Sequence, residues 1–206
     1  PLYFSLRAQG KSVHLANLSF SQLPEGDAST PAALRKFTYA TPQEHRYCPE
    51  LLLARWFKEH EDSDIPIYVF PQTGVKPLKE AYQYLVKTLD IDTVILIDGG
   101  TDSLMRGDES GLGTPHEDVA SILAVRDLPV SRKILACLGF GIDAFHGVCH
   151  ADFLEAVARL IETDGYLGIL GLQKEMPEYW KYKAACRYVF SAMPQNVSIV
   201  SSSIIS

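Results

Sequence analysis

VILIDGGTDSLMRGDE, residues 94–109, is the stretch of this chain that decides its fold. An uninterrupted apolar run ends abruptly at Asp98 and gives way to a loop rich in glycine and acidic residues. Continuous β-branched and aliphatic runs are typical of strands covered by helices on both faces. A long polar loop orders many backbone groups and buries little, so such loops in compact domains are usually functional or disordered. The stretch therefore predicts a buried strand that leads into a functional loop.

Apolar periodicity on either side of this stretch predicts strands that alternate with helices. This pattern is typical of a three-layer α/β/α sandwich with a mainly parallel sheet, and a single α/β domain over residues 1–206 accounts for it. The Pro-, Ser-, Thr- and Gly-rich residues 21–49 are expected to form a long irregular connection. The strands are expected at residues 12–18, 65–70, 94–97 and 134–138 and in a terminal run at 196–205, and the helices at 1–7, 52–60, 78–89, 115 onward, 153–165 and 177–193.

Composition excludes several classes of function. The chain has 206 residues, 47% of them hydrophobic, and a net charge of −6 without any Lys/Arg run, so nucleic acid is not an expected partner. No apolar run approaches the roughly 18 residues that span a bilayer, and no signal peptide is visible. We therefore expect a cytoplasmic protein without a membrane partner, and a homo-oligomer is compatible with the sequence. The cysteines form no C-x-x-C pair and are expected to be reduced thiols: Cys48, Cys137, Cys149 and Cys186.

Acidic residues gather where the predicted strand ends. In open α/β sheets, ligands bind at the carboxyl ends of strands, and Asp98 lies at such an end. Converging carboxylates need a cation, or one of them must stay protonated. Oxygen ligands suit Mg²⁺ or Mn²⁺. We therefore expect Asp98, Asp102, Asp108 and Glu109 to bind Mg²⁺ or Mn²⁺, with Asp102 also acting in catalysis. The alternative for Asp108 and Glu109 is an ordinary solvated surface position.

Glycines and hydroxyl groups in the same loop predict a binding site for a phosphate-bearing ligand. Gly99 and Gly100 permit sharp turns and close backbone approach. The Arg106 guanidinium could pair with an anionic group. Gly139 and Gly141 follow another predicted strand, although no full G-x-G-x-x-G is present. The complete set of ligand-binding candidates is Gly99, Gly100, Thr101, Ser103, Arg106, Gly139 and Gly141.

A helix start follows the acidic loop. Thr114-Pro115-His116-Glu117 matches a capping box with proline at the first helical position. Anion binding by the free N–H groups of this helix start is an alternative that we weigh below capping. Glu117 and Asp118 are explained as first-turn acids that the helix dipole favours, and a structural role is preferred for both.

The loop after the strand at residues 134–138 carries a second group of reactive side chains. Asp143 and His146 are candidates for an acid/base pair and complete the expected catalytic set with Asp102. His146, Cys149 and His150 could instead suggest zinc. Gly147 argues against one continuous helix holding both imidazoles, and a zinc site usually needs four ligands. For Cys149 a packed thiol is preferred over a nucleophile.

Ile97–Leu104 together with Gly107-Asp108-Glu109 resembles domain-of-unknown-function family 1152, and Ala16–Phe20 and Gly139–Gly141 fit the same pattern. The resemblance implies a Rossmann-like fold that opens with a glycine-rich strand–loop–helix. Residues 1–7 would then belong to the helix, so the first strand and its loop would precede this numbering. Bacterial members are similar but carry Ser-Pro at Thr114-Pro115, and the chain departs from them at His116-Glu117. The family implies no activity.

These patterns favour a cytosolic enzyme, a hydrolase or a transferase, that acts on a nucleotide-like or phosphate-bearing small molecule at the Asp98-Gly99-Gly100 loop with a divalent cation. The alternative is a non-catalytic module that binds a nucleotide or metabolite and acts through a protein partner. A third hypothesis is a structural subunit whose acidic loop is an interface.

Overall fold

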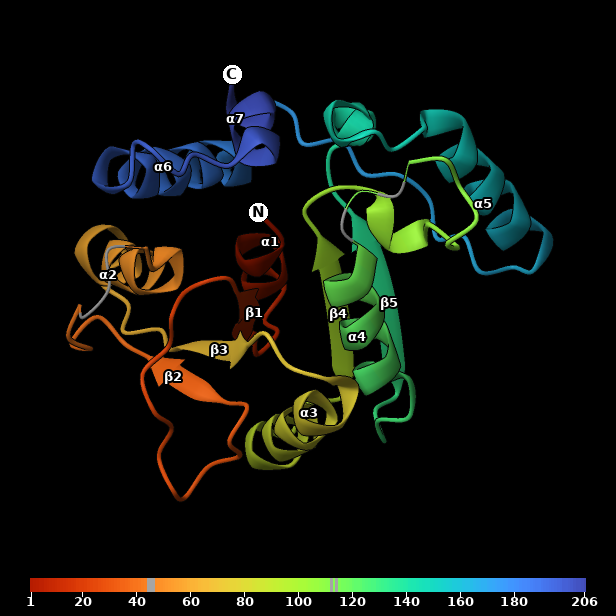
Figure 1. Ribbon diagram of the computed structural model, residues 1–206. Helices are drawn as coiled ribbons and strands as arrows, with labels where there is room; N and C mark the ends of the chain where they lie inside the picture. Colours follow the sequence, from red (N-terminus) through yellow and green to blue (C-terminus); the bar gives the residue numbers. More distant parts are fainter. Residues whose placement is uncertain (44–46, 112, 114) are drawn as a thin grey trace. The chain divides into compact units, whose positions relative to one another are not determined.

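The computed structural model describes residues 1–43, 47–111, 113 and 115–206 and has a mixed α/β fold (Figure 1). The chain divides into two compact units. Unit 1 comprises residues 1–84, 172–197 and 205, and unit 2 comprises residues 85–171, 198–204 and 206. None of the described helices has the length and apolar character needed to span a membrane. All four cysteines are free thiols, as expected from their spacing.

Unit 1 is built on a three-stranded sheet of order β1-β3-β2. Strand β1 (Leu15–Ser19) runs parallel to β3 (Ile67–Pro71), with Leu15 opposite Ile67. Strand β2 (Arg35–Phe37) pairs antiparallel with β3 and lies inside the region expected to be irregular. Three residues leave too little apolar alternation for a strand to be recognised from sequence. Residues 67–70 of the central strand β3 are all buried, as expected for a strand with a neighbour on each edge.

Three helices contribute to the main hydrophobic cluster of unit 1: α1 (Leu2–Ala8), α2 (Pro49–Glu61) and α6 (Pro177–Ala192). Helix α2 begins with proline in its first turn and ends at Asp62 in a left-handed conformation. Its Trp56 and Phe57 pack in the core with Val69 of β3. Lys181 of α6 pairs with Glu61 and lies 4.3 Å from the centre of the Phe4 ring. Residues distant in sequence are thus joined in one core.

A buried glutamate ties β1 to the start of α2. Glu50 is almost fully buried. It accepts hydrogen bonds from the Asn17 side chain at 2.6 Å, from the Ser21 hydroxyl at 3.4 Å and from the Cys48 thiol at 3.7 Å. A buried carboxylate is tolerated when donors surround it in this way. The network is a structural link at the carboxyl end of β1.

Unit 2 contains a two-stranded parallel sheet. Strand β4 (Thr93–Asp98) follows α3 (Val75–Leu89) and pairs with β5 (Arg132–Cys137), so that Asp98 lies opposite Cys137. The connection between the strands contains the 3-10 helix η1 (Asp102–Leu104) and α4 (Pro115–Arg126). After β5 come the 3-10 helix η2 (Ile142–His146) and α5 (His150–Glu162). Both η1 and η2 therefore follow the carboxyl end of a strand, where the sequence predicted the site.

The prediction for the C-terminal run is wrong. Residues expected to form a strand instead form helix α7 (Ile199–Ile205). The Ser198 side chain accepts a hydrogen bond from the Ser201 backbone N–H at 3.2 Å and caps the helix. This local cap outweighs the β-branched composition of the run, which favours a strand.

Candidate metal centre

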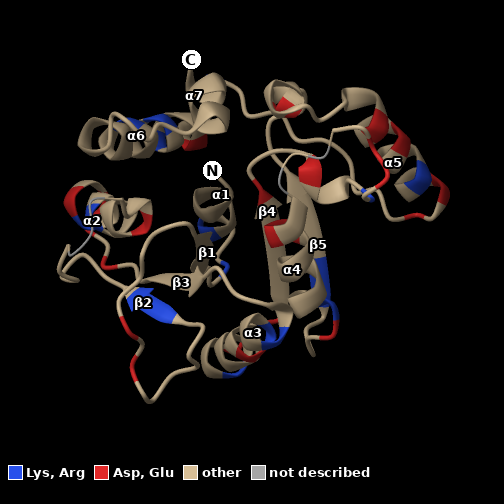
Figure 2. Ribbon diagram, in the orientation of Figure 1, with Lys and Arg blue, Asp and Glu red and all other residues tan. Residues whose placement is uncertain are grey.

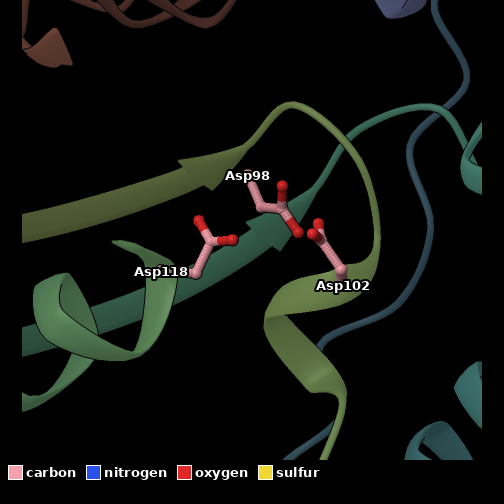
Figure 3. A group of neighbouring side chains, drawn as sticks. All are labelled: Asp98, Asp102 and Asp118. Carbon is pink, nitrogen blue, oxygen red and sulfur yellow. The ribbon is translucent and has the colours of Figure 1, made fainter. Parts of the chain in front are cut away.

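Three carboxylates converge at the carboxyl end of β4 (Figure 3). Asp98 is the last residue of β4, Asp102 is the first residue of η1, and Asp118 lies in the first turn of α4. One oxygen atom from each lies within 4.8 Å of the other two. Figure 2 shows the acidic residues at the end of β4 and at the start of α4. A β-strand, a 3-10 helix and an α-helix thus aim three oxygen ligands at one point.

Backbone hydrogen bonds fix the loop that carries two of these carboxylates. The Ser103 N–H donates to Oδ2 of Asp98 at 3.0 Å. The Met105 N–H donates to the Asp102 carbonyl at 3.0 Å and closes η1. The Ser103 hydroxyl lies 3.3 Å from the thiol of Cys137, the residue opposite Asp98 on β5. The loop is therefore attached to both strands of the sheet.

Burial and repulsion by neighbouring carboxylates raise the pKa values of Asp98 and Asp118. Burial is the main cause for Asp98, opposed by hydrogen bonds from Ser103 and reinforced by the charges of neighbouring aspartates. For Asp118, burial followed by the charges of Asp98 and Asp102 raises the pKa to about 7. Burial and the same carboxylates raise the pKa of the Cys137 thiol to about 11. A divalent cation would relieve this repulsion, and three carboxylate oxygens are ligands that Mg²⁺ and Mn²⁺ accept.

Asp143 and His146, expected as an acid/base pair, lie beside this group. The buried Asp143 accepts hydrogen bonds from the backbone N–H of Thr101 and from its hydroxyl, the latter at 3.1 Å. His146 is half-exposed, and its Nδ1 lies 3.9 Å from Oδ1 of Asp143. Asp143 also contributes to the raised pKa values of Asp98 and Asp118. The structure thus brings the two predicted loops together through Thr101.

Two glycines allow these loops to approach closely. A Cβ atom at Gly100 would collide with the Asp143 carboxylate. Gly113 has φ +64°, and a Cβ there would lie 2.6 Å from Oδ2 of Asp102. Any larger residue at either position would displace a carboxylate of the site.

Replacing Gly100 by alanine should destabilise the protein by about 1–3 kcal/mol, the usual cost of forcing an extra methyl group into a packed region. Gly99→Ala is the matched control, because a Cβ at the neighbouring Gly99 meets open space. The free energy of unfolding from urea titrations checks this prediction. Equal destabilisation by the two substitutions would contradict the close packing of Gly100 on Asp143.

Asp108 and Glu109, expected as metal ligands, do not belong to the group of converging carboxylates. The Arg106 guanidinium lies 3.8 Å from Asp108. The Glu109 carboxylate accepts a hydrogen bond from the backbone N–H of Arg106 at 2.8 Å and another from the backbone N–H of Gly107 at 2.8 Å. The backbone contacts of Glu109 close a local exposed turn. The contact with Asp108 engages the Arg106 guanidinium, which was expected to pair with a ligand.

Asp118 is the ligand candidate that sequence reasoning missed. Asp118 lies in the first turn of α4, where the helix dipole favours acidic residues and so explains its position. The same explanation applies to Glu117, which lies in the same turn and pairs with His116 at 2.6 Å. The available signal was topological. A helix that returns from the carboxyl end of β4 begins at the same sheet edge as Asp98, so its first-turn acids can reach that edge.

The remaining candidates have mixed outcomes. The capping residue Thr114 lies outside the described residues. Gly141 is the N-cap residue of η2 with φ +84°, and Gly139 packs against Ile142, so both glycines shape the turn. The metal-ligating group found in the described part of the chain does not include the zinc alternatives His146, Cys149 and His150.

Comparison with known proteins gives a family match. A family model described as "Protein of unknown function (DUF1152)" matches residues 23–191, a span that contains the carboxylate group and η2. No curated protein and no solved structure matches the chain.

Proposed function

The chain belongs to the family of unknown function DUF1152, and from its site we propose a divalent-cation-dependent enzyme, a hydrolase or a transferase, that acts on a phosphate-bearing small molecule. The convergence of Asp98, Asp102 and Asp118 within 4.8 Å carries this proposal. Burial and neighbouring negative charges raise the pKa values of Asp98 and Asp118, and a bound Mg²⁺ or Mn²⁺ would offset the repulsion among the three carboxylates. A rigid oxygen-ligand group at the end of a strand supports a cation role more directly than a packing role.

The roles of the residues follow from their contacts. Asp98, Asp102 and Asp118 would hold the cation, which when bound neutralises charge on a phosphate group. The N–H of Ser103 holds Asp98, and Thr101 holds Asp143. Asp143 would orient His146, and the half-exposed imidazole of His146 would move a proton to or from the reacting oxygen atom. Histidine is the residue type most often used for such proton transfer.

A second candidate is a module that binds the same cation and ligand without turnover and acts through a protein partner. The exposed Arg106–Glu109 turn beside the site favours it, because charged loops of this kind can contact a partner. Consumption of the ligand separates the two, since only an enzyme turns its ligand over.

The Rossmann-like three-layer architecture and the cytoplasmic location are part of the same proposal. Parallel strands are almost always covered by helices on both faces, and each unit contains a parallel pair: β1–β3 and β4–β5. Four free thiols suit a reducing compartment.

Thermal unfolding with a panel of nucleotides and sugar phosphates, with and without Mg²⁺ or Mn²⁺, tests the proposal. A ligand present at 100 times its Kd should add about 2.7 kcal/mol to the stability of the protein. A shift that needs both ligand and cation supports the proposed site. Unchanged cation and ligand binding in Asp98→Asn and Asp102→Asn would contradict the proposed function.

The stability of the cation-free protein should fall as the pH rises, and a bound cation should remove that fall. The pKa of Asp118 is about 7 in the folded protein and about 3.9 in the unfolded chain. The folded state therefore holds the extra proton between these values, and without a cation this contribution to stability falls as pH rises from about 4 to about 7. A cation must displace that proton, so its stabilising effect should grow over the same range and level off above about pH 7. Melting temperatures measured across this range in EDTA and in Mn²⁺ check both signs.

A further inference from the structure

An exposed aromatic ring projects from the short helix η2. Phe145 is 77% exposed, although its neighbour Asp143 is buried. Its ring meets the His146 imidazole edge-on, with centroids 5.5 Å apart. Leaving a phenylalanine in water forgoes the free energy that burial would provide. Single exposed apolar residues are common, so exposure alone does not assign a role.

The backbone that presents this ring is well fixed. The Ile142 N–H donates to the Gly139 carbonyl at 3.0 Å, and the Val148 N–H donates to the Asp143 carbonyl at 3.1 Å. The Asp143 side chain accepts from Thr101 in the neighbouring loop. Phe145 is thus displayed by a short helix that is anchored at both ends and in its middle. A fixed aromatic ring makes a better stacking surface than one on a mobile tail, because less entropy is lost on binding.

A continuous line of contacts joins this ring to the carboxylate group. Phe145 touches His146, His146 faces Asp143, and Asp143 is bonded to Thr101. Thr101 directly precedes Asp102, one of the three converging carboxylates. A ligand with its phosphate at the carboxylates and a flat ring on Phe145 would therefore pass the half-exposed imidazole. In a nucleotide, the sugar separates base and phosphate in this way.

The other exposed ring in this loop differs. Phe140 is 55% exposed and packs against Phe153 of α5, with centroids 5.3 Å apart. It already has an aromatic neighbour that explains its position. Phe145 is in contact with His146, the proposed proton-transfer residue, and this contact singles it out.

We propose that Phe145 is the stacking surface for a nucleobase, so that the phosphate-bearing ligand of this site is a nucleotide. The inference rests on the proposed function, because the phosphate group is taken to bind at the cation held by Asp98, Asp102 and Asp118. Stacking suits any base, since every base has a π face. Phe145 therefore provides selection for a nucleotide over a simple phosphate rather than for one base.

The test compares two probes that share a phosphate chain, ATP and inorganic tripolyphosphate, each with Mg²⁺, by calorimetric titration of the whole chain. The unmodified protein should bind ATP about tenfold or more tightly than tripolyphosphate, as expected for one base stacked on an aromatic ring. Phe145→Ala should weaken ATP binding by the same factor and leave tripolyphosphate binding unchanged. Phe145→Trp should retain ATP binding. Leu170→Ala, which removes an 89% exposed apolar side chain elsewhere in unit 2, should change neither affinity.

The outcomes separate this inference from the proposed function. Equal affinities of the unmodified protein for ATP and tripolyphosphate would overturn the stacking role, as would equal losses of affinity for both probes in Phe145→Ala. Neither result would contradict the proposed cation site. Absence of Mg²⁺-dependent binding of either probe would overturn the proposed function and this inference together. Unchanged ATP binding in Phe145→Ala would overturn only the assignment of Phe145.

Discussion

Asp118→Asn should strongly reduce the stabilisation of the protein by Mn²⁺ and should raise the stability of the cation-free protein above pH 7. Asparagine keeps the size of the side chain but removes one of three repelling charges. Without a cation, burial beside Asp98 and Asp102 raises the pKa of Asp118 to about 7, so its ionised form is unfavourable there. With a cation, loss of a carboxylate ligand should weaken binding by at least the roughly 10- to 100-fold that follows loss of an outer-sphere partner.

Asp108→Asn is the matched control for this substitution. Asp108 is an exposed acid of the same loop that contacts Arg106 instead of the carboxylate group. Melting temperatures of both variants, with EDTA and with Mn²⁺ at about pH 8, provide the comparison. Retained Mn²⁺ stabilisation in Asp118→Asn, or its loss in Asp108→Asn, would mean that the cation binds elsewhere in the loop.

Trp56→Ala should destabilise the protein by about 3–5 kcal/mol, the usual cost of deleting a large aromatic side chain from a core. Trp56 is only 2% exposed and packs edge-on against Phe4 and Phe57 in unit 1. Its indole Nε1 is buried without a hydrogen-bond partner among the described residues, so the substitution removes packing rather than a hydrogen bond.

The second tryptophan provides the control. Trp180 of α6 is 57% exposed and contacts the rings or side chains of Tyr179 and Lys183. Trp180→Ala should cost less than about 1 kcal/mol. Guanidinium titrations followed by far-UV circular dichroism avoid the change in tryptophan fluorescence. Similar losses in the two variants would contradict the packing of α2 in the core of unit 1.

The proximity of Asp98 and Asp102 could be predicted from the sequence because its signals are local. An apolar run that stops at Asp98 marks the end of a strand, and ligands gather at such ends in α/β sheets. Asp102 follows within one turn of chain, so its proximity to Asp98 needs no knowledge of the rest of the fold. Asp143 was also placed at this edge, because it follows the neighbouring strand β5.

Contacts across the chain were harder to predict. Acids in a loop look alike in sequence, and the backbone N–H groups that engage Glu109 become visible only when the turn is formed. Asp118 looked like a helix-dipole acid because its distance from Asp98 depends on how α4 packs against β4. In helix α7 a serine cap overrides β-branched residues, and in β2 the strand is too short for periodicity.

All three converging carboxylates come from the sequence window 98–118, one strand–loop–helix segment. Their sequence separations are small, so little chain entropy is lost when they meet, and contacts of this local kind form early in folding. Asp143 comes from the loop after β5, so its place beside them depends on the pairing of β5 with β4. A cation bound by this segment would therefore stabilise a local part of unit 2 without contacts from Asp143 and His146, which lie in the 3-10 helix after β5.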